Sequence, residues 1–158
     1  MNAYPFLRQL RLLFAALVVS QLVLAGASAF LVMQQGPLGS ISHESEKIML
    51  VASAGALALF VFLSNAMYDR KTALLRQSAS LQEKSSGIRS LLILKWALRE
   101  AASLASIVFF LLTAKPLFLA VTGVSLLSFS VTFPTHALFV RDLGLSPEEE
   151  DEIQKLSS

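Results

Sequence analysis

The sequence predicts an all-α integral membrane protein, a four-helix bundle of two antiparallel transmembrane hairpins followed by a short cytosolic C-terminal helix. Of the 158 residues, 54% are hydrophobic and only 15% are charged, which is more apolar surface than a soluble domain of this length can bury. The apolar residues fall into four long runs, whereas the end of the chain is polar and acidic. The chain therefore divides into a transmembrane domain, residues 1–141, and an acidic cytosolic tail, residues 142–158.

Each apolar run is long enough to cross a bilayer core, which takes about 20 helical residues. The first two runs contain no charge, the third has three charged residues near its start, and the fourth has a histidine as its only ionisable residue. The predicted transmembrane helices are residues 12–33, 48–67, 91–114 and 117–140.

The start of the first run also fits a second interpretation. Arg8 and Arg11, the apolar stretch after them and the A-x-A motif at residues 27–29 are typical of a cleaved secretion signal. The apolar run continues to Met33, however, which makes it longer than a signal core usually is. We therefore expect a membrane anchor, with cleavage as the alternative.

Lysine and arginine are distributed unevenly between the two sides of the predicted bundle. Positive flanking residues resist translocation, so the side that carries more of them stays in the cytoplasm. The N-terminal flank and the link between the second and third helices hold Arg8, Arg11, Arg70, Lys71, Arg76, Lys84 and Arg89. The other side has only Lys47 and Lys115. We expect both termini to be cytoplasmic and the protein to lie in a bacterial inner membrane.

Two turns and one kink are expected within the bundle. The link of residues 68–89 contains good helix formers, so the second and third helices should continue past the membrane and turn near Gly87. Only Lys115 and Pro116 separate the third and fourth helices, which predicts a tight antiparallel hairpin. Pro134 removes a backbone donor and should kink the fourth helix.

The tail contains a strong helix start. Ser146 is a capping residue, proline follows at the first helical position, and Glu149 stands three residues after the cap. A short acidic helix over residues 147–156 should follow. This helix is either a solvated cap or an acidic segment that docks on the basic link or on a partner protein.

Small residues predict where the first two helices approach each other. Helices in lipid have no hydrophobic drive to associate, so small side chains must allow close backbone contact. Gly26 and Gly55 lie at nearly the same depth in small-residue stretches of the first and second helices. We expect these two helices to pack closely at the glycines.

Glu100 is the residue of the third helix that most needs an explanation. It lies about 7 Å inside a bilayer boundary expected near Lys95. Lys95 and Arg99 can extend to the lipid phosphates, and Trp96 is expected at the same interface. A carboxylate should instead turn into the bundle. The candidate polar cluster at this depth comprises Glu100, Arg99, Ser64, Asn65, Thr132 and His136, with Thr135 nearby.

Two roles are open for this cluster. In the first, the polar side chains satisfy Glu100 and fix the cytoplasmic end of the bundle. In the second, the cluster binds an ion or a proton, with Glu100 as the titrating group and His136 as a helper.

A stretch of about 70 residues resembles a known family. Glu100 followed by Ala101, the apolar segment after them, the close at residues 114–118 and the polar pair at residues 76–77 are similar to the proteolipid subunit c of F-type ATP synthases. In that family, an intramembrane carboxylate of a helical hairpin carries the ion. The resemblance covers about residues 49–118, and it implies that Glu100 is the ion carrier.

The sequence lacks the signals of several other functional classes. The chain has no cysteine, which excludes disulfides, thiolate metal sites and cysteine nucleophiles. It contains no catalytic or phosphate-loop motif, and its formal charge of +2 does not indicate a nucleic-acid partner. His43 with Glu44 and Glu46 is expected to form a solvated loop and not a metal site. We expect no cofactor.

Two function classes remain. The favoured prediction is a non-catalytic polytopic membrane protein, an accessory, assembly or structural subunit that engages a partner through its cytoplasmic face. The alternative is an oligomeric proton- or sodium-translocating subunit with Glu100 as ion carrier. The expected partners are the lipid bilayer and either further copies of the chain or a larger membrane complex.

Overall fold

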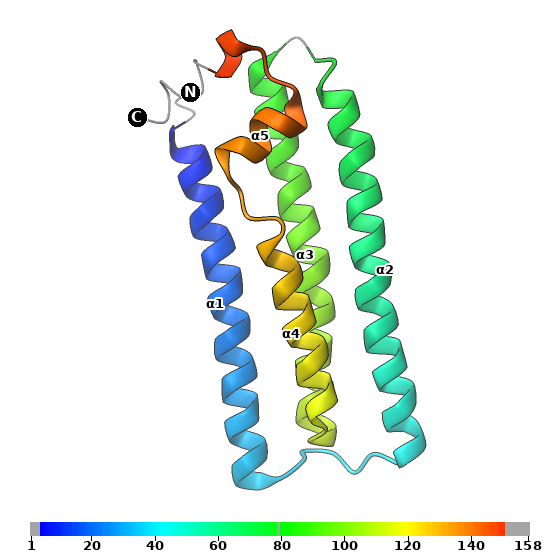
Figure 1. Ribbon diagram of the computed structural model, residues 1–158. Coiled ribbons are helices and arrows are strands. Elements are labelled where there is room, and N and C mark those ends of the chain that lie inside the picture. Colours follow the sequence, from blue (N-terminus) through cyan, green and yellow to red (C-terminus); the bar gives the residue numbers. More distant parts are fainter. Residues whose placement is uncertain (1–3, 79, 151–158) are drawn as a thin grey trace.

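The computed structural model describes residues 4–78 and 80–150, with side chains from Leu7 onward. All of its regular elements are helices (Figure 1). The helices are α1 (Tyr4–Gln35), α2 (His43–Leu75), α3 (Leu81–Thr113), α4 (Pro116–Ser130) and α5 (His136–Leu143). The described residues contain no strand. The predicted all-α class is confirmed.

Helix α3 is the central element of the fold. It packs against α1 and α2, which flank it, and forms an antiparallel hairpin with α4 (Figure 1). We call the end where α2 stops and α3 starts the α2–α3 end. The end with the α1–α2 loop and the α3–α4 turn is called the opposite end. Helix α5 lies at the α2–α3 end.

Local sequence signals set the starts of three helices. Ser42 is the N-cap of α2, and its hydroxyl accepts a hydrogen bond from the Ser45 N–H at 3.3 Å. Ser80 caps α3 in the same way by accepting from the Glu83 N–H at 3.4 Å. Helix α4 begins with Pro116, whose missing N–H has no helical partner to lose at that position.

The α1–α2 loop is tied to the last turn of α3. The Leu38 N–H donates to the Leu111 carbonyl at 2.9 Å, and the Gly39 N–H donates to the Leu112 carbonyl at 3.2 Å. A Cβ at Gly39 would lie 3.1 Å from that Leu112 oxygen, so the close approach of the two backbones favours glycine. These bonds satisfy carbonyls that the end of a helix leaves open.

Three helices in the described residues are long and apolar enough to cross a membrane, judged by length and composition: α1 from Leu7, α2 and α3. They contain nearly all of the predicted spans 12–33, 48–67 and 91–114. Helix α4 has 15 residues, a length of about 22 Å that falls short of a hydrocarbon core of about 30 Å. The fourth predicted span is therefore not confirmed.

The prediction of one kinked helix over residues 117–140 was wrong. Helices α4 and α5 are separate, and residues 131–135 between them are not helical. Pro134 has no N–H to continue the helix. The Thr135 hydroxyl accepts a hydrogen bond from the Leu138 N–H at 3.1 Å and so caps a new helix. Proline and cap together end one helix and start another.

The turn predicted near Gly87 comes earlier in the chain, because α2 ends at Leu75 and α3 begins at Leu81. Gly87 is inside α3, where a Cβ would lie 2.5 Å from a methyl carbon of Leu75. The glycine therefore lets the end of α2 pack closely on the start of α3. The chain reverses earlier than predicted because Ser80 provides the cap for α3.

The predicted contact of the first two helices at Gly26 and Gly55 was also wrong. A Cβ on either glycine would meet no atom within 4 Å. Helices α1 and α2 pack mainly on α3, which lies between them, and not on each other (Figure 1). Small residues favour close packing but do not decide which neighbour supplies it.

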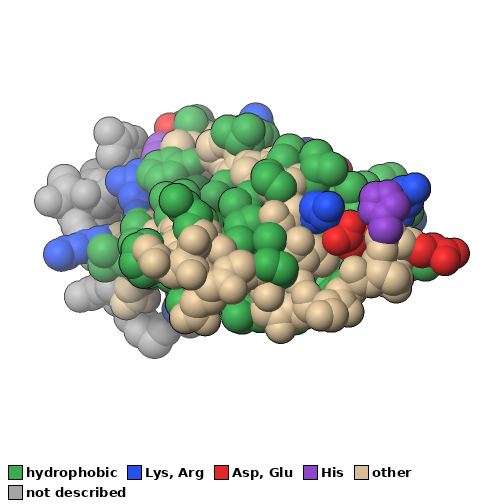
Figure 2. Space-filling model, turned by 90° about the horizontal axis from the view of Figure 1, so that it is seen from below, with side chains coloured by type: hydrophobic (Ala, Val, Ile, Leu, Met, Phe, Trp, Pro, Cys, Tyr) green, Lys and Arg blue, Asp and Glu red, His purple; other side chains and the backbone are tan. Residues whose placement is uncertain are grey.

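The helices bury polar side chains and expose apolar ones. The exposed fraction of Gln21 is 0%, whereas that of Met33 is 84%. Other buried polar residues are Ser28, Ser53, Ser64, Ser103, Ser106, Thr122 and Ser125. Other exposed apolar residues are Leu22, Val23, Phe30, Val51, Phe62 and Leu127. Figure 2, a view onto the opposite end, shows how much of the visible surface is apolar.

The predicted start of the tail helix is confirmed for residues 147–150, which are helical. The Glu149 N–H donates to the Ser146 hydroxyl at 3.2 Å, and the Ser146 N–H donates to the Glu149 carboxylate at 2.9 Å. These reciprocal bonds form a capping box. The rest of the predicted helix, residues 151–156, lies outside the described residues.

The start of the tail docks on α3. The Lys84 ammonium and the Glu149 carboxylate form an ion pair at 2.8 Å, and the Lys84 side chain is buried. The hydrogen bond from Lys84 holds the pKa of Glu149 below its ordinary value, because it stabilises the charged carboxylate. Of the two interpretations of the tail, this contact favours docking on the basic link.

Candidate functional site

Polar side chains gather at the α2–α3 end, where residues 131–135 interrupt the helical chain. Helix α4 stops there and leaves carbonyl groups without helical partners. The Arg99 guanidinium donates from Nη1 to the Ser128 carbonyl at 2.5 Å and to the Thr132 hydroxyl at 3.3 Å. Arg99 thus places a positive charge at the negative end of the α4 dipole.

Arg99 is only 3% exposed, so the prediction that it extends to the lipid phosphates was wrong. The reason is the early end of α4, which supplies carbonyl acceptors inside the bundle. Arg99 also donates from Nη2 to the Asn65 side-chain oxygen at 3.4 Å. The guanidinium of Arg99 on α3 therefore contacts α2, α4 and the segment after α4.

Trp96 was predicted at the membrane interface but lies in the core, fully buried. Its indole N–H donates to the Thr132 hydroxyl at 3.1 Å. Its ring packs edge-on against the Phe14 ring of α1, with centroids 5.4 Å apart. Trp96 joins α1, α3 and the segment after α4, and it uses the same Thr132 oxygen as Arg99.

The structure brings together only part of the predicted polar cluster. Asn65 and Thr132 contact Arg99 as described. The Ser64 hydroxyl donates to the Val61 carbonyl of its own helix at 3.1 Å. Glu100 is partly buried and has no hydrogen bond or ion pair with any described residue. The titrating role of Glu100 stays a prediction.

His136, another member of the predicted cluster, begins α5. It is partly buried, and its Nε2 atom has no hydrogen-bond partner among the described residues. The structure shows no bond that joins His136 to Glu100 within this part of the chain.

Two further contacts fix the non-helical residues 131–135 and the helix α5 that follows them. The Arg11 side chain of α1 donates to the Pro134 carbonyl at 3.2 Å. The Tyr68 hydroxyl of α2 donates to the Asp142 carboxylate of α5 at 2.7 Å in a buried position. Non-helical backbone inside a bundle needs such partners, because its polar groups are otherwise unsatisfied.

Arg76 fixes the end of α5. Its Nε donates to the Asp142 carbonyl at 2.7 Å and its Nη2 to the Arg141 carbonyl at 3.4 Å. Arg141 in turn donates to the Asp142 carboxylate at 2.8 Å. Lys95 lies 4.4 Å from the centre of the Tyr68 ring, which is a favourable cation–π distance. The α2–α3 end is thus rich in arginine and lysine held at defined positions.

The sequence analysis missed the roles of Arg11, Tyr68 and Asp142. One local signal was available: proline followed by a threonine N-cap at residues 134–135 marks a helix stop and a new start. Recognising it would have placed Asp142 on a separate short helix. The partners of Arg11 and Tyr68 carry no local signal, because they lie more than 70 residues away in the chain.

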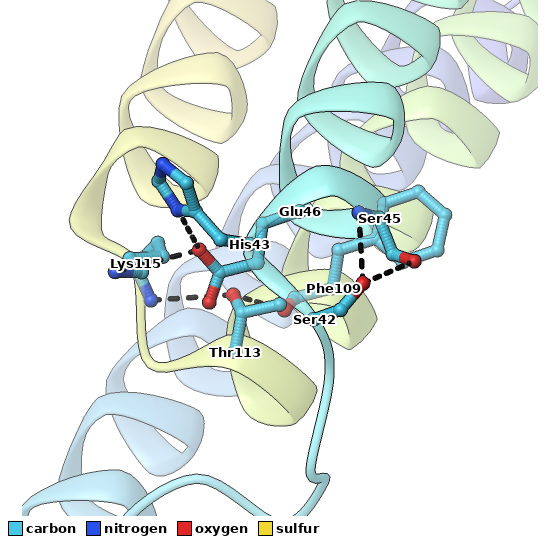
Figure 3. A network of polar contacts seen from close by, with 7 residues as sticks. All are labelled: Ser42, His43, Ser45, Glu46, Phe109, Thr113 and Lys115. Carbon is cyan, nitrogen blue, oxygen red and sulfur yellow. Dashed lines mark hydrogen bonds and ion pairs between the residues drawn. The ribbon is translucent and has the colours of Figure 1, made fainter.

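The opposite end has a smaller polar network (Figure 3). The Glu46 carboxylate lies 3.3 Å from His43 Nδ1 and 3.4 Å from the Lys115 ammonium. Figure 2 shows acidic, basic and histidine side chains together on one side of this end. In the described part of the chain, no group of three or more His, Asp or Glu side chains is placed to hold a metal ion.

No protein family model matches the chain, and no curated protein or solved structure matches it significantly. The function must therefore be argued from the residues and their geometry alone.

Proposed function

We propose that the protein is an integral membrane protein in which α1, α2 and α3 cross the bilayer and α4 completes the bundle as the return arm of a hairpin. The observation that carries this proposal is the distribution of side chains, with Gln21 fully buried and Met33 84% exposed. In water this arrangement is unfavourable, because apolar surface stays hydrated and polar groups lose their water. In lipid the exposed apolar side chains are favourably solvated, and polar side chains of membrane helices face the interior of the bundle as they do here.

The distribution of cations supports an orientation with the α2–α3 end in the cytoplasm. Arg70, Lys71 and Arg89 are exposed there, and positive flanks resist translocation. Both termini of the chain would then be cytoplasmic, in a bacterial inner membrane. The non-helical residues 131–135 are compatible with this depth, because their carbonyls bind Arg11 and other bundle residues.

The proposed role is that of a non-catalytic accessory, assembly or structural subunit that engages a partner through the cytoplasmic face. Exposed cations at the α2–α3 end and an acidic tail that starts by docking on Lys84 support this role. Such a surface offers charges of both signs at fixed positions, which favours a specific partner orientation.

The absence of cysteine allows a direct test of the topology. Single variants Arg70→Cys and His43→Cys place a thiol at exposed positions near the two ends of α2. In intact cells, a membrane-impermeant maleimide should label residue 43 and should label residue 70 only after permeabilisation. Labelling of residue 70 in intact cells would contradict the orientation, and release of the chain by carbonate washing would contradict membrane integration.

The partner role is tested by affinity purification from native membranes. The full chain should retain a defined partner protein, and a chain truncated after Gly144 should lose it or bind it less. A charge-neutralised Arg70→Gln, Lys71→Gln variant tests the cationic part of the same face. Retention of no partner by the intact chain in several mild detergents would contradict the role.

The alternative function is an oligomeric proton- or sodium-translocating subunit. The observation that favours it is that Glu100 is partly buried but has no partner among the described residues. Labelling of Glu100 by a hydrophobic carbodiimide, blocked by protons or sodium, would support it. Unchanged ion flux in a Glu100→Gln variant would contradict it, with Glu44→Gln as the matched control for loss of one carboxylate.

A further inference from the structure

A polar pocket lies at the α2–α3 end between α2, α3, α5 and the segment after α4. Its volume is about 460 Å³, which is within the usual range for small-molecule sites. The charged residues that line it are Arg76, Lys95, Arg99, Arg141, Asp69 and Asp142. With four cations and two carboxylates, the pocket carries net positive charge.

The charges of this pocket are not mutually neutralised. Asp142 is already bound by Tyr68 and Arg141. Lys95 and Arg99 have no ion pair with any described residue. Asp69, the second carboxylate, is exposed and forms no ion pair in this part of the chain. Lys95 and Arg99 therefore line the pocket without an ion-pair partner among the described residues, and the pocket stays net positive although Asp69 and Asp142 lie close enough to act on the charge of Lys95.

Two residues that line the pocket carry buried donors without partners in the described part of the chain. The Nε atom of Arg99 and the hydroxyl of Thr72 have no hydrogen bond with any described residue, and the side chains are 3% and 4% exposed. A buried polar group without a partner is costly, so a bound acceptor would stabilise the folded protein. The two donors come from different helices, α3 and α2.

A phosphate group fits these features better than a carboxylate. Its tetrahedral oxygens accept hydrogen bonds from several directions, as donors on separate helices require, and its negative charge complements lysine and arginine. On the proposed membrane orientation, Lys95 lies near the inner boundary of the hydrocarbon core, since about 20 residues separate it from the end of α3. This is the depth of lipid phosphates.

We propose that the pocket binds a phosphate group, either of an anionic lipid headgroup or of a small phosphorylated solute, with Lys95 and Arg99 as charged contacts and Thr72 as a hydroxyl donor. The lipid source rests on the membrane orientation proposed above, whereas the pocket and its charge do not depend on the proposed partner role. A negative binding result would therefore leave the membrane topology and partner experiments unaffected.

The experiment uses the purified full chain and separates the two sources of phosphate. In neutral detergent, the melting temperature is measured with sodium phosphate and with sodium chloride at equal ionic strength. In nanodiscs, phosphatidylcholine alone is compared with phosphatidylcholine plus phosphatidic acid, and retained lipid is counted by native mass spectrometry. Stabilisation by phosphate identifies a soluble ligand, and selective retention of phosphatidic acid identifies a lipid.

Variants test whether the binding uses this pocket. Lys95→Gln and Thr72→Val should each weaken binding, the former about tenfold, because a charged partner is lost. Arg70→Gln removes an exposed cation of α2, the helix that also carries Thr72. Arg70 does not line the pocket, so this variant should bind phosphate like the wild type. Arg99→Lys keeps the charge but loses the planar fork, and it should weaken binding while reducing stability as well.

The proposal is overturned if neither inorganic phosphate nor phosphatidic acid binds in preference to chloride or phosphatidylcholine. It is also overturned if Lys95→Gln and Thr72→Val bind as well as Arg70→Gln does. Because Lys95 is only partly buried, the Lys95→Gln variant should fold. The binding test is therefore valid even if the Arg99→Lys variant does not fold.

Discussion

The two ends of the bundle are held together in different ways. At the α2–α3 end, buried side chains join elements that are distant in the sequence, as in the pairs Arg99–Ser128, Tyr68–Asp142 and Arg11–Pro134. At the opposite end, Glu46 contacts its near neighbour His43 and the distant Lys115, both of which are exposed, and the other distant contacts are backbone hydrogen bonds from Leu38 and Gly39 to the end of α3. The first end is joined by buried side chains, and the second by backbone hydrogen bonds and more exposed side chains.

This difference has a simple physical basis. A buried polar group that loses its partner retains its desolvation cost, whereas an exposed one is satisfied by water. Changes at the α2–α3 end should therefore be costly, and changes at the opposite end should be nearly neutral. The following substitutions test that contrast, from the largest expected effect to the smallest.

Trp96→Ala should have the largest effect. It removes a fully buried ring from the contact of α1, α3 and the segment after α4, and it should lower the free energy of unfolding by about 3–5 kcal/mol. Trp96 is the single tryptophan, so unfolding must be followed by circular dichroism in detergent. The outward-facing control Leu94→Ala should cost less than about 1 kcal/mol. Equal losses in the two variants would contradict the assignment of Trp96 to the core.

Tyr68→Phe should have a smaller effect on the same end. It leaves the ring beneath Lys95 in place but removes the hydrogen bond to Asp142, at a cost of about 1–3 kcal/mol. A double-mutant cycle with Asp142→Asn measures the interaction of the two side chains. Purely additive losses would show that the pair does not couple α2 to α5.

The contribution of Glu149 should depend on pH. Its pKa lies below the ordinary value of 4.5 because of the hydrogen bond from Lys84. The stability from this pair is therefore fully present above the ordinary value and is lost as the pH falls through the lowered one. Glu149 is partly exposed, so the effect should be at most about 1 kcal/mol.

The measurement for Glu149 compares unfolding of the wild type and of Glu149→Gln at pH 7 and pH 3. The wild type should be the more stable at pH 7, and the difference should be smaller at pH 3, because the stability from the pair is lost as the pH falls through the lowered pKa. Glu148→Gln, at an exposed neighbouring position, is the matched control. A difference of the same size at both pH values would show that the contact is not electrostatic.

Glu46→Gln should have the smallest effect. It removes the carboxylate that links His43 and Lys115 at the opposite end (Figure 3). His43 and Lys115 are exposed and Glu46 is partly buried, so the pairs should contribute about 0.5 kcal/mol, and salt screens them. The melting temperature should change little, and any change should shrink in high salt. A loss as large as that of Tyr68→Phe would contradict the proposed contrast between the ends.

Much of the fold was predictable because its signals are local. Runs of apolar residues predicted four long helices, of which the structure has three, and the serine, proline and glutamate at residues 146–149 predicted a helix start that the structure confirms. These features depend on composition and on hydrogen bonds between near neighbours. They need no knowledge of which helices touch.

The site was harder to predict because it depends on the packing of distant segments. The direction of Arg99 follows from the early end of α4, which supplies the Ser128 carbonyl. From the sequence, Arg99 was placed in the candidate polar cluster but was also expected to reach the lipid phosphates, and a continuous fourth helix gave no sign of the carbonyl acceptor inside the bundle. The predicted contact of the first two helices at Gly26 and Gly55 was wrong for a related reason. The small size of these residues does not reveal that α3 lies between α1 and α2.

The hydrogen bond from Arg11 to the Pro134 carbonyl joins the first helix to a segment 123 residues later. During translation, Arg11 leaves the ribosome long before its acceptor exists. This contact can therefore form only after residue 134 has been synthesised, so α1 is first held by its packing on α3 and gains this acceptor later.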